Sequence, residues 1–387
     1  MTNAVHLGCL LSLVFAAGCK LGPGMPRAWS AFRGGPLHHG SADGARPIGQ
    51  PQQVWEFDTG GTVESSPTVV HGVVYVGTFA DHLYALDAET GDERWRYAVD
   101  GLVRCSPSVV DGVVYFGADD DRFYALDARS GELRWFVQLG EGGQQSSPAV
   151  VGDTVYFGGF DQLVYAIGKR DGELRWTFET DGRILSSPAV VDGLVAIGSQ
   201  DGRVYGLEAE SGAERFRYQT GAPVWSSPAI VDGLVLVGSD DGNLYALDAV
   251  TGREAWRLPT GGPVFSSPVV HRGEGVVYVG SGDHHLYACT LAEGRELWRC
   301  NLRGRVLGTP ALVGEHLYVG GEGAGGDDPG ALFAIDRIRG EVVWRFGIGR
   351  TVWSSPTVVD GSLWFGSHDG RVRRLVERER RGGKVDG

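Results

Sequence analysis

Residues 226–258 read SSPAIVDGLVLVGSDDGNLYALDAVTGREAWRL, and variants of this stretch recur along most of the chain. Its proline belongs to a regular series, which consists of Pro67, Pro107, Pro148, Pro188, Pro228, Pro268, Pro310 and Pro356. Successive prolines are 40, 41, 40, 40, 40, 42 and 46 residues apart. A repeat of about 40 residues is typical of one blade of a β-propeller.

Each repeat contains four runs rich in β-branched and aromatic residues, which predict four short strands, here lettered A to D. In the quoted copy the runs are separated by Asp232-Gly233, by residues 239–242 and by a turn that ends at Gly252. An Asp-Gly pair favours a two-residue hairpin turn, because both positions of that turn need positive φ. The repeat is therefore predicted to be an antiparallel meander.

Two columns of the repeat predict how the blades are arranged. The proline at the start of strand A indicates an edge strand beside the central channel, since proline cannot donate to a ladder. A large aromatic side chain in strand D is expected to fill the space between neighbouring blades. This aromatic column consists of Trp55, Trp95, Trp135, Trp176, Phe216, Trp256, Trp298 and Trp344.

The chain opens with a lone strand D around Trp55 and closes with strands A to C in residues 354–376. Pairing the two ends completes a last blade and leaves no open edge where the ring closes. The predicted fold is all-β: an eight-bladed β-propeller of four-stranded antiparallel blades, spanning residues 54–377. The formal net charge of -13 argues against a nucleic-acid partner, which requires a basic surface.

The N-terminal segment predicts export. Residues 7–17 form an apolar run that is too short to span a bilayer as a helix and fits a signal peptide over residues 1–19. The run leads into Ala-Ala-Gly-Cys, which resembles a bacterial lipobox with Cys19 as the lipidated residue; an ordinary cleaved signal is the alternative. Residues 20–53, rich in Gly and Pro, are predicted to form a tether and lead-in.

The C-terminal basic run, residues 371–384, is expected to be a solvated and partly frayed end, with a flexible basic tail over residues 378–387. Cys289 and Cys300 fall on strands C and D of one blade. Strand alternation places them on opposite faces unless a bulge intervenes, so buried free thiols are expected there.

The sequence offers no catalytic or metal-binding constellation. The Asp-rich stretches 119–121, 240–241 and 327–328 lack the spacing of a calcium loop, and we assign them to turn geometry. The histidine pair 38–39 has no Cys, Asp or Glu at ligand spacing, and the pair 284–285 has no carboxylate or cysteine repeated at matching positions. We therefore expect no metal.

The pattern LYALDAxTGxxxW, seen with variations at residues 83–95, 123–135, 244–256 and 332–344, resembles the tryptophan-docking repeat of the PQQ-type β-propeller superfamily. Residues 29–34 resemble the lead-in of its short BamB-like bacterial lipoproteins. One branch of the superfamily implies quinoprotein dehydrogenases, which hold pyrroloquinoline quinone (PQQ) and calcium over the propeller axis. The other implies non-catalytic lipoproteins of outer-membrane β-barrel assembly.

The dehydrogenase branch usually carries adjacent cysteines or a C-x-x-C-H haem site, and this sequence has neither. The expected function is therefore a binding scaffold without cofactor, at the periplasmic face of the outer membrane or the cell surface. Its expected partners are envelope proteins, including a β-barrel assembly subunit, and the membrane itself through the lipid on Cys19. The alternatives are a PQQ- and calcium-dependent enzyme, or a sensor or polysaccharide-binding propeller.

The residue before each SSP-like triplet lies between strand D of one blade and strand A of the next. These residues are predicted to surround one mouth of the channel, and we call them the channel-mouth ring: Glu64, Arg104, Leu185, Trp225, Phe265, Leu307 and Trp353, with Gln144 or Gln145 in the third blade. The ring is predicted to bind a partner; the alternative is that it only fills the channel. The Gly-rich loop 320–330 carries the six extra residues of the longest repeat and is a second candidate.

Overall fold

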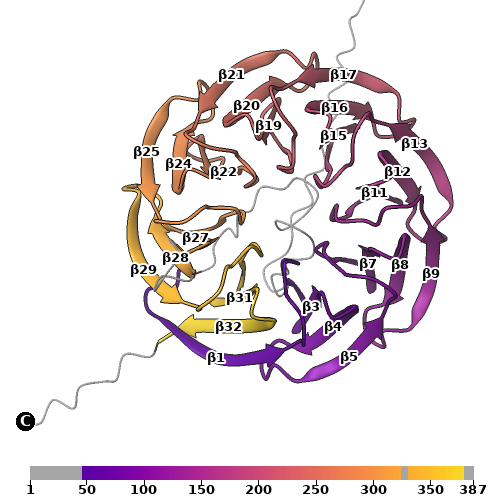
Figure 1. Ribbon diagram of the computed structural model, residues 1–387, viewed down its shortest axis with the longest axis horizontal. Coiled ribbons are helices and arrows are strands. Elements are labelled where there is room, and N and C mark those ends of the chain that lie inside the picture. Colours follow the sequence, from indigo (N-terminus) through magenta and orange to yellow (C-terminus); the bar gives the residue numbers. More distant parts are fainter. Residues whose placement is uncertain (1–45, 324–329, 379–387) are drawn as a thin grey trace, which may run out of the picture.

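The computed structural model describes residues 46–323 and 330–378. Within them it contains 32 strands and no helix. The strands form eight four-stranded antiparallel sheets, which surround a central channel like the blades of a propeller (Figure 1). The predicted fold class is thus confirmed. No helix in the described residues is long and apolar enough to cross a membrane.

The strands shorten toward the axis, where the blades converge. The innermost are β2 (Thr68–Val70), β6 (Ser108–Val110), β10 (Ala149–Val151), β14 (Ala189–Val191), β18 (Ala229–Val231), β22 (Val269–His271), β26 (Ala311–Val313) and β30 (Thr357–Val359). The second strands are β3 (Val73–Gly77), β7 (Val113–Ala118), β11 (Thr154–Gly158), β15 (Leu194–Gly198), β19 (Leu234–Gly238), β23 (Val276–Gly280), β27 (His316–Gly321) and β31 (Ser362–Gly366).

The remaining strands are longer. The third are β4 (His82–Asp87), β8 (Arg122–Asp127), β12 (Leu163–Gly168), β16 (Arg203–Glu208), β20 (Asn243–Asp248), β24 (His285–Thr290), β28 (Ala331–Asp336) and β32 (Arg371–Glu377). The outermost are β5 (Glu93–Ala98), β9 (Leu133–Gln138), β13 (Leu174–Glu179), β17 (Glu214–Gln219), β21 (Glu254–Pro259), β25 (Glu296–Asn301), β29 (Glu341–Gly347) and β1 (Pro51–Asp58).

The Asp-Gly hairpin turns have the backbone geometry that their sequence predicts. Asp232 and Gly233, between β18 and β19, have φ values of 48° and 80°, as a two-residue hairpin of this kind requires. Asp192 and Gly193 repeat this geometry with 46° and 76°. The Asp-Gly signal in the sequence therefore identified these hairpins correctly.

The two ends of the chain close the ring as expected, because β1 pairs with β32. The basic run does not begin as a frayed end, however. Arg371–Glu377 is a strand of the closing blade, and the Arg373 side chain is buried beside Asp369 and Glu56. The start of the run thus belongs to the strands predicted over residues 354–376, and these ion pairs compensate the charge of Arg373 within the sheet. Residues 379–387 lie outside the described residues.

The propeller also begins earlier than residue 54. The first strand starts at Pro51, and Ile48 is only 1% exposed. The Ile48 amide donates to the Tyr318 hydroxyl (2.6 Å), and the Trp344 indole donates to the Ile48 carbonyl (2.8 Å). The end of the expected lead-in is therefore part of the core. Residues 1–45, including the predicted signal peptide and Cys19, lie outside the described residues.

The aromatic column lies between blades. The Trp176 indole donates to the carbonyl of Ala209 in the next blade (3.0 Å), and a Cβ added to Gly212 there would lie 2.7 Å from the indole ring. Trp55, Trp95, Trp135, Phe216, Trp256 and Trp298 pack on the corresponding glycines Gly91, Gly131, Gly172, Gly252, Gly294 and Gly340. Each of these glycines is thus required by the close approach of an aromatic ring.

Cys289 and Cys300 are both buried and free, and they belong to different hydrophobic clusters. A bulge between Ala288 and Cys289 places Cys289 opposite Glu296, while Cys300 pairs with Leu286. Leu286, the partner of Cys300, lies three residues before Cys289 on the same strand, so the two thiols face opposite sides of the blade despite the bulge.

Candidate binding site at the channel mouth

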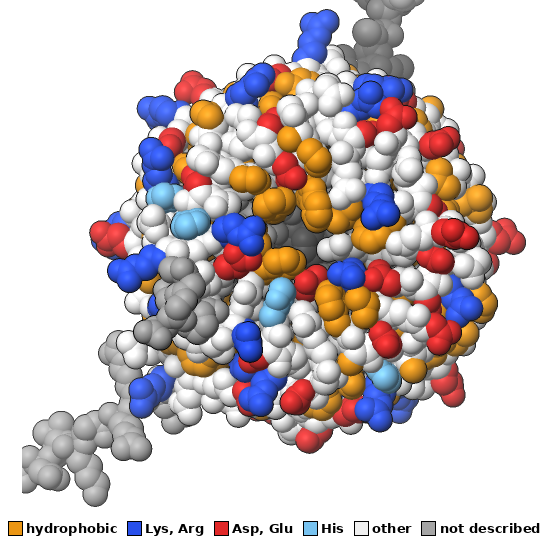
Figure 2. Space-filling model, viewed as in Figure 1, with side chains coloured by type: hydrophobic (Ala, Val, Ile, Leu, Met, Phe, Trp, Pro, Cys, Tyr) orange, Lys and Arg blue, Asp and Glu red, His pale blue; other side chains and the backbone are white. Residues whose placement is uncertain are grey.

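One mouth of the channel holds a cavity of about 430 Å³. Its walls are the connections that run from the outermost strand of one blade to the innermost strand of the next. Figure 2 shows hydrophobic side chains around much of the rim. The lining includes all the predicted members of the channel-mouth ring, namely Glu64, Arg104, Gln145, Leu185, Trp225, Phe265, Leu307 and Trp353.

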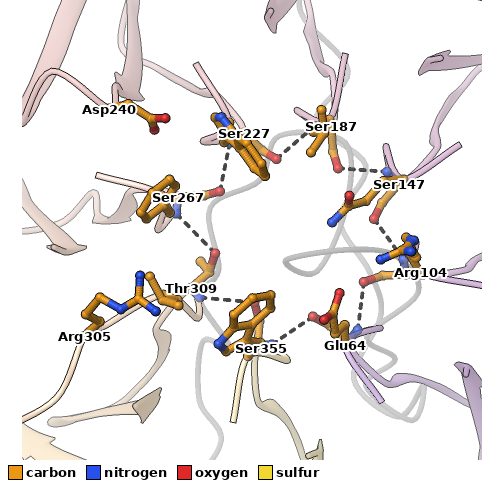
Figure 3. A pocket seen from close by; sticks show the side chains of 18 residues that line it. Glu64, Arg104, Ser147, Ser187, Ser227, Asp240, Ser267, Arg305, Thr309 and Ser355 are labelled. Carbon is orange, nitrogen blue, oxygen red and sulfur yellow. Dashed lines mark hydrogen bonds between the residues drawn. The ribbon is translucent and has the colours of Figure 1, made fainter. Parts of the chain in front are cut away.

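A closed ring of hydrogen bonds surrounds the channel at this cavity (Figure 3). The second residue of each SSP-like triplet donates its backbone N–H to the side-chain hydroxyl of its counterpart in the next blade. In order, these residues are Ser66, Ser106, Ser147, Ser187, Ser227, Ser267, Thr309, Ser355 and again Ser66, with distances of 2.9 to 3.3 Å. We call this the hydroxyl ring.

The first residue of the triplet accepts a hydrogen bond within its own blade, and in Ser226 the hydroxyl also donates to the Ser266 carbonyl of the next blade (3.1 Å). The Ser226 hydroxyl accepts the N–H of Gly238 at the end of β19 (3.1 Å), and Cys105 accepts that of Gly117 through its sulfur (3.3 Å). Sequence reasoning recognised the SSP triplet as a repeat marker and missed the hydrogen bonds that its two hydroxyl positions make. The available signal was that every second position carries Ser or Thr, whereas the first tolerates Cys and Gly.

One arc of the mouth is polar. Arg104 forms an ion pair with Asp119 (2.8 Å), and its guanidinium lies 4.6 Å from the centre of the Phe79 ring. In the third blade the ambiguity is settled, because Gln144 is fully buried and bonds to the Ser146 carbonyl, whereas Gln145 faces the cavity. Gln145 is therefore the ring residue there.

The other arc is apolar and partly exposed. Trp225 is 39% exposed and meets Phe265 nearly edge to face, with ring centroids 5.9 Å apart. Trp353 is 37% exposed, lies 4.7 Å from the His368 ring and donates its indole N–H to Glu322 (3.3 Å). Both side chains line the cavity at the mouth.

A second circle of residues stands behind the ring, at the turns between the second and third strands. Three of its charged or ionisable members have partners there: Asp119 pairs with Arg104, Glu322 with Arg305 (2.6 Å), and His368 approaches Glu64 (3.5 Å). Asp119 Oδ1 and His368 Nε2 have no hydrogen-bond partner among the described residues, and neither has Asp240 Oδ1. Asp240 differs because, within the described residues, no oppositely charged side chain lies within 4.0 Å of its carboxylate. Burial, helped by the neighbouring charge of Asp241, raises the pKa of Asp240 to about 6.

The two aspartates of the turn at residues 240–241 therefore have different roles. Asp241 accepts hydrogen bonds from the amides of Gly221 and Asn243 and from the Tyr245 hydroxyl (2.7 to 3.0 Å). This is the turn role assigned from the sequence. Asp240, the preceding residue, takes no such role with its side chain and faces the cavity instead. The stretch 327–328 lies outside the described residues.

The mouth can be tested against the PQQ and calcium of the dehydrogenase branch. Calcium requires several converging oxygen ligands. No group of three or more His, Cys, Asp or Glu residues suited to a metal occurs in residues 46–323 and 330–378. The arginines Arg104 and Arg305, which could hold a tricarboxylate quinone, are already paired with Asp119 and Glu322. The residues present do not fit this cofactor.

Comparison with solved structures establishes the fold. BamB from Moraxella catarrhalis matches with a TM-score of 0.72 at 20% identity, covering 84% of this chain and 100% of that one. Europium-containing methanol dehydrogenase gives 0.76 at 14% identity, covering 89% and 91%. Quinohemoprotein alcohol dehydrogenase from Comamonas testosteroni gives 0.75 at 16%, covering 92% and 81%. At such identities the likeness shows the propeller fold alone.

Comparison of the sequence with family models identifies the family of the chain. No curated protein matches the chain. The family model described as outer membrane protein assembly factor BamB matches residues 49–177, 160–272 and 251–325, which together extend over more than half of the chain. With its eight docked blades and PQQ-type repeats, the chain belongs to the family of outer membrane protein assembly factor BamB.

Proposed function

We propose that this chain is a non-catalytic binding scaffold of the cell envelope, which captures a protein partner at the channel mouth and acts, like BamB, in outer-membrane β-barrel assembly. The observation that carries the proposal is the pair of exposed tryptophans, Trp225 and Trp353, beside an open cavity in a chain of the BamB family. Partly exposed aromatic side chains around a cavity are typical anchors of protein interfaces.

The fold separates stability from binding at this mouth. The hydroxyl ring and the docking tryptophans hold neighbouring blades together through the backbone and through repeated side chains. The side chains of the channel-mouth ring are left to vary, from Glu64 and Arg104 on one arc to Trp225 and Phe265 on the other. A rigid scaffold that presents a variable surface is suited to recognition.

We also propose that the protein is exported and held at the periplasmic face of the outer membrane by a lipid on Cys19. Mass spectrometry of the protein purified from membranes tests this anchor, since a diacylglyceryl group should appear on a chain that begins at Cys19. A chain that begins elsewhere without a lipid contradicts it.

The binding role is tested with the double variant Trp225→Ala/Trp353→Ala. Tagged protein is used to capture partners from detergent-solubilised outer membranes of the source organism, and the β-barrel assembly subunits in the eluate are quantified by mass spectrometry. We expect the double variant to lose most of this capture while its melting temperature stays within a few degrees of the unmodified protein, because both indoles are more than a third exposed.

The matched control is Phe136→Ala/Leu174→Ala, which removes two apolar side chains, 50% and 60% exposed, from the outer strands β9 and β13. This control should retain capture. If both double variants capture the assembly subunits as well as the unmodified protein does, the mouth is not the binding surface.

A further inference from the structure

The inference concerns the isolated carboxylate of Asp240 and rests on the proposed function of the channel mouth. Asp240 is held between two members of the apolar arc by backbone hydrogen bonds. Its own N–H donates to the Pro223 carbonyl (3.0 Å), in the connection that leads to Trp225. The preceding carbonyl, of Ser239, accepts the N–H of Val264 (3.0 Å), which directly precedes Phe265.

The polar arc shows what such a carboxylate binds when a cation is available. Arg104 there forms an ion pair with Asp119 (2.8 Å) and lies 4.6 Å from the centre of the Phe79 ring. Cation, carboxylate and aromatic ring thus form one unit within the chain. A guanidinium held this way gains both the ion pair and the attraction of the ring face.

The same two positions recur three blades later with one change. Arg104 precedes Asp119 by 15 residues, and Trp225 precedes Asp240 by 15 residues. Trp225 therefore occupies the position of the arginine, and Asp240 is left without a cation. No ion pair to Asp240 within 4.0 Å occurs among the described residues; the arginine of this side of the mouth, Arg305, is paired with Glu322.

A half-buried carboxylate without a partner is unfavourable for folding, because it loses hydration and gains no counter-charge. Asp240 nevertheless lines the same cavity as Trp225 and Phe265. In Figure 3 its carboxylate points toward the circle of residues that surrounds the channel. Two aromatic rings and an uncompensated negative charge complement a cationic side chain.

We propose that this part of the mouth binds an arginine or lysine side chain from an extended segment of the protein partner, between the Asp240 carboxylate and the Trp225–Phe265 pair. The partner's cation takes the place that Arg104 fills on the opposite arc. Leu185 and Leu307, which also line the cavity, offer apolar contact to the residues that flank the cation.

The test uses two acetylated and amidated peptides, Gly-Ser-Leu-Arg-Leu-Ser-Gly and the same peptide with citrulline in place of arginine. Citrulline keeps the shape and removes the charge. Affinity is measured by isothermal titration calorimetry, and the contact by the ¹⁵N shift of the Trp225 indole, which is assigned with Trp225→Phe. We expect the arginine peptide to bind about tenfold more tightly than the citrulline peptide and to shift the Trp225 signal.

Asp240→Asn should bind both peptides equally and weakly. The control Asp192→Asn makes the same charge change at the hairpin between β14 and β15, at the opposite end of the strands, and should keep the preference for arginine. Equal affinity of the unmodified protein for both peptides overturns the proposal, as does a preference that survives Asp240→Asn. Lack of saturable binding of the arginine peptide at millimolar concentration also overturns it.

These outcomes are independent of the proposed function. If Trp225→Ala/Trp353→Ala loses capture of the assembly subunits while the two peptides bind alike, the mouth binds a partner through apolar contacts and only the cation site is wrong. If capture is unchanged and the peptides are still distinguished, the cation site stands and the assembly subunits bind at a surface other than the mouth.

Discussion

The backbone N–H of Ser355 donates to the hydroxyl of Ser66 over 2.9 Å, although the two residues are 289 positions apart. This bond closes the hydroxyl ring at the inner edge of the propeller. At the outer edge the same closure is made by β1 and β32, with Phe57 opposite Val372. The ends of the chain are therefore joined twice, on both sides of the closing blade.

The first prediction concerns a single link of the hydroxyl ring. Ser187→Ala removes the acceptor of the Ser147 N–H, and both residues are at least 95% buried. A buried amide left without a partner should lower the free energy of unfolding by about 1–3 kcal/mol. Urea unfolding followed by circular dichroism measures this loss. Ser187→Thr keeps the acceptor, as Thr309 does, and should lie close to the unmodified protein; equal midpoints for all three would show that the link contributes nothing.

The second prediction concerns the one blade that docks with phenylalanine. A Cβ at Gly206 would lie 2.3 Å from Cε1 of Phe216, whereas in the preceding blade an alanine, Ala166, stands opposite Trp176. Gly206→Ala alone should therefore destabilise the protein by about 1–3 kcal/mol. The double variant Gly206→Ala/Phe216→Trp gives this blade the alanine–tryptophan pair of its neighbours. Its loss of stability should be smaller than the sum of the losses caused by the two single substitutions. Strict additivity of the melting temperatures would contradict this coupling.

The third prediction concerns Ile48, which precedes the first strand. Ile48→Ala should lower the stability by about 2–5 kcal/mol, because Ile48 is buried against the closing blade and supports the carbonyl that receives the Trp344 indole. Val54→Ala, at a position 48% exposed, is the control and should change stability by less than about 0.5 kcal/mol. Similar thermal melting of the two variants would mean that residues before β1 act only as a tether.

The fourth prediction concerns pH. The pKa of Asp240 is raised from 3.8 to about 6 by burial and by Asp241, so the folded protein holds a proton there that the unfolded chain has already released. Stability then falls as pH rises from about 4 to 6, and the cost of the ionised group is fully present above that window.

Asp240→Asn removes this cost. It should stabilise the protein at pH 7.5 by about 1 kcal/mol, allowing for solvent screening at a half-buried site, and the difference should vanish near pH 4. Thermal unfolding across this range, with Asp192→Asn as control, gives the measurement. A loss of stability in Asp240→Asn at pH 7.5 would refute the assignment of an uncompensated charge.

The architecture could be predicted because its signals are local. The Asp-Gly hairpins, the proline of the edge strand and the docking tryptophan all lie within one repeat, so each blade is specified by its own residues. The regular spacing also predicted the closure of the ring by the two chain ends, since no other arrangement completes the last blade. The last strand was predicted, but the compensation of its charge was not, because the partners of Arg373, Glu56 and Asp369, come from another strand and a turn.

The site was predicted only as a set of positions. The column of residues before each SSP triplet identified the mouth residues. The sequence could not decide between Gln144, which is buried, and Gln145, which lines the cavity, because that choice depends on how the extra residue of this repeat is accommodated in space. The sequence also assigned the same turn role to Asp240 and Asp241. Their roles differ because one carboxylate reaches the amide of Gly221 and the other faces the cavity.

The sequence by itself determined the blade, the number of its copies and the identity of the residues around the mouth, because hydrogen bonding within a meander depends on neighbours a few residues away. Only the tertiary structure decided which side chains at the mouth are paired. Burial, ion pairing and exposure at the mouth are set jointly by residues from different blades. The isolation of Asp240 beside Trp225 and Phe265, in contrast to the pairing of Asp119 with Arg104, follows from that convergence.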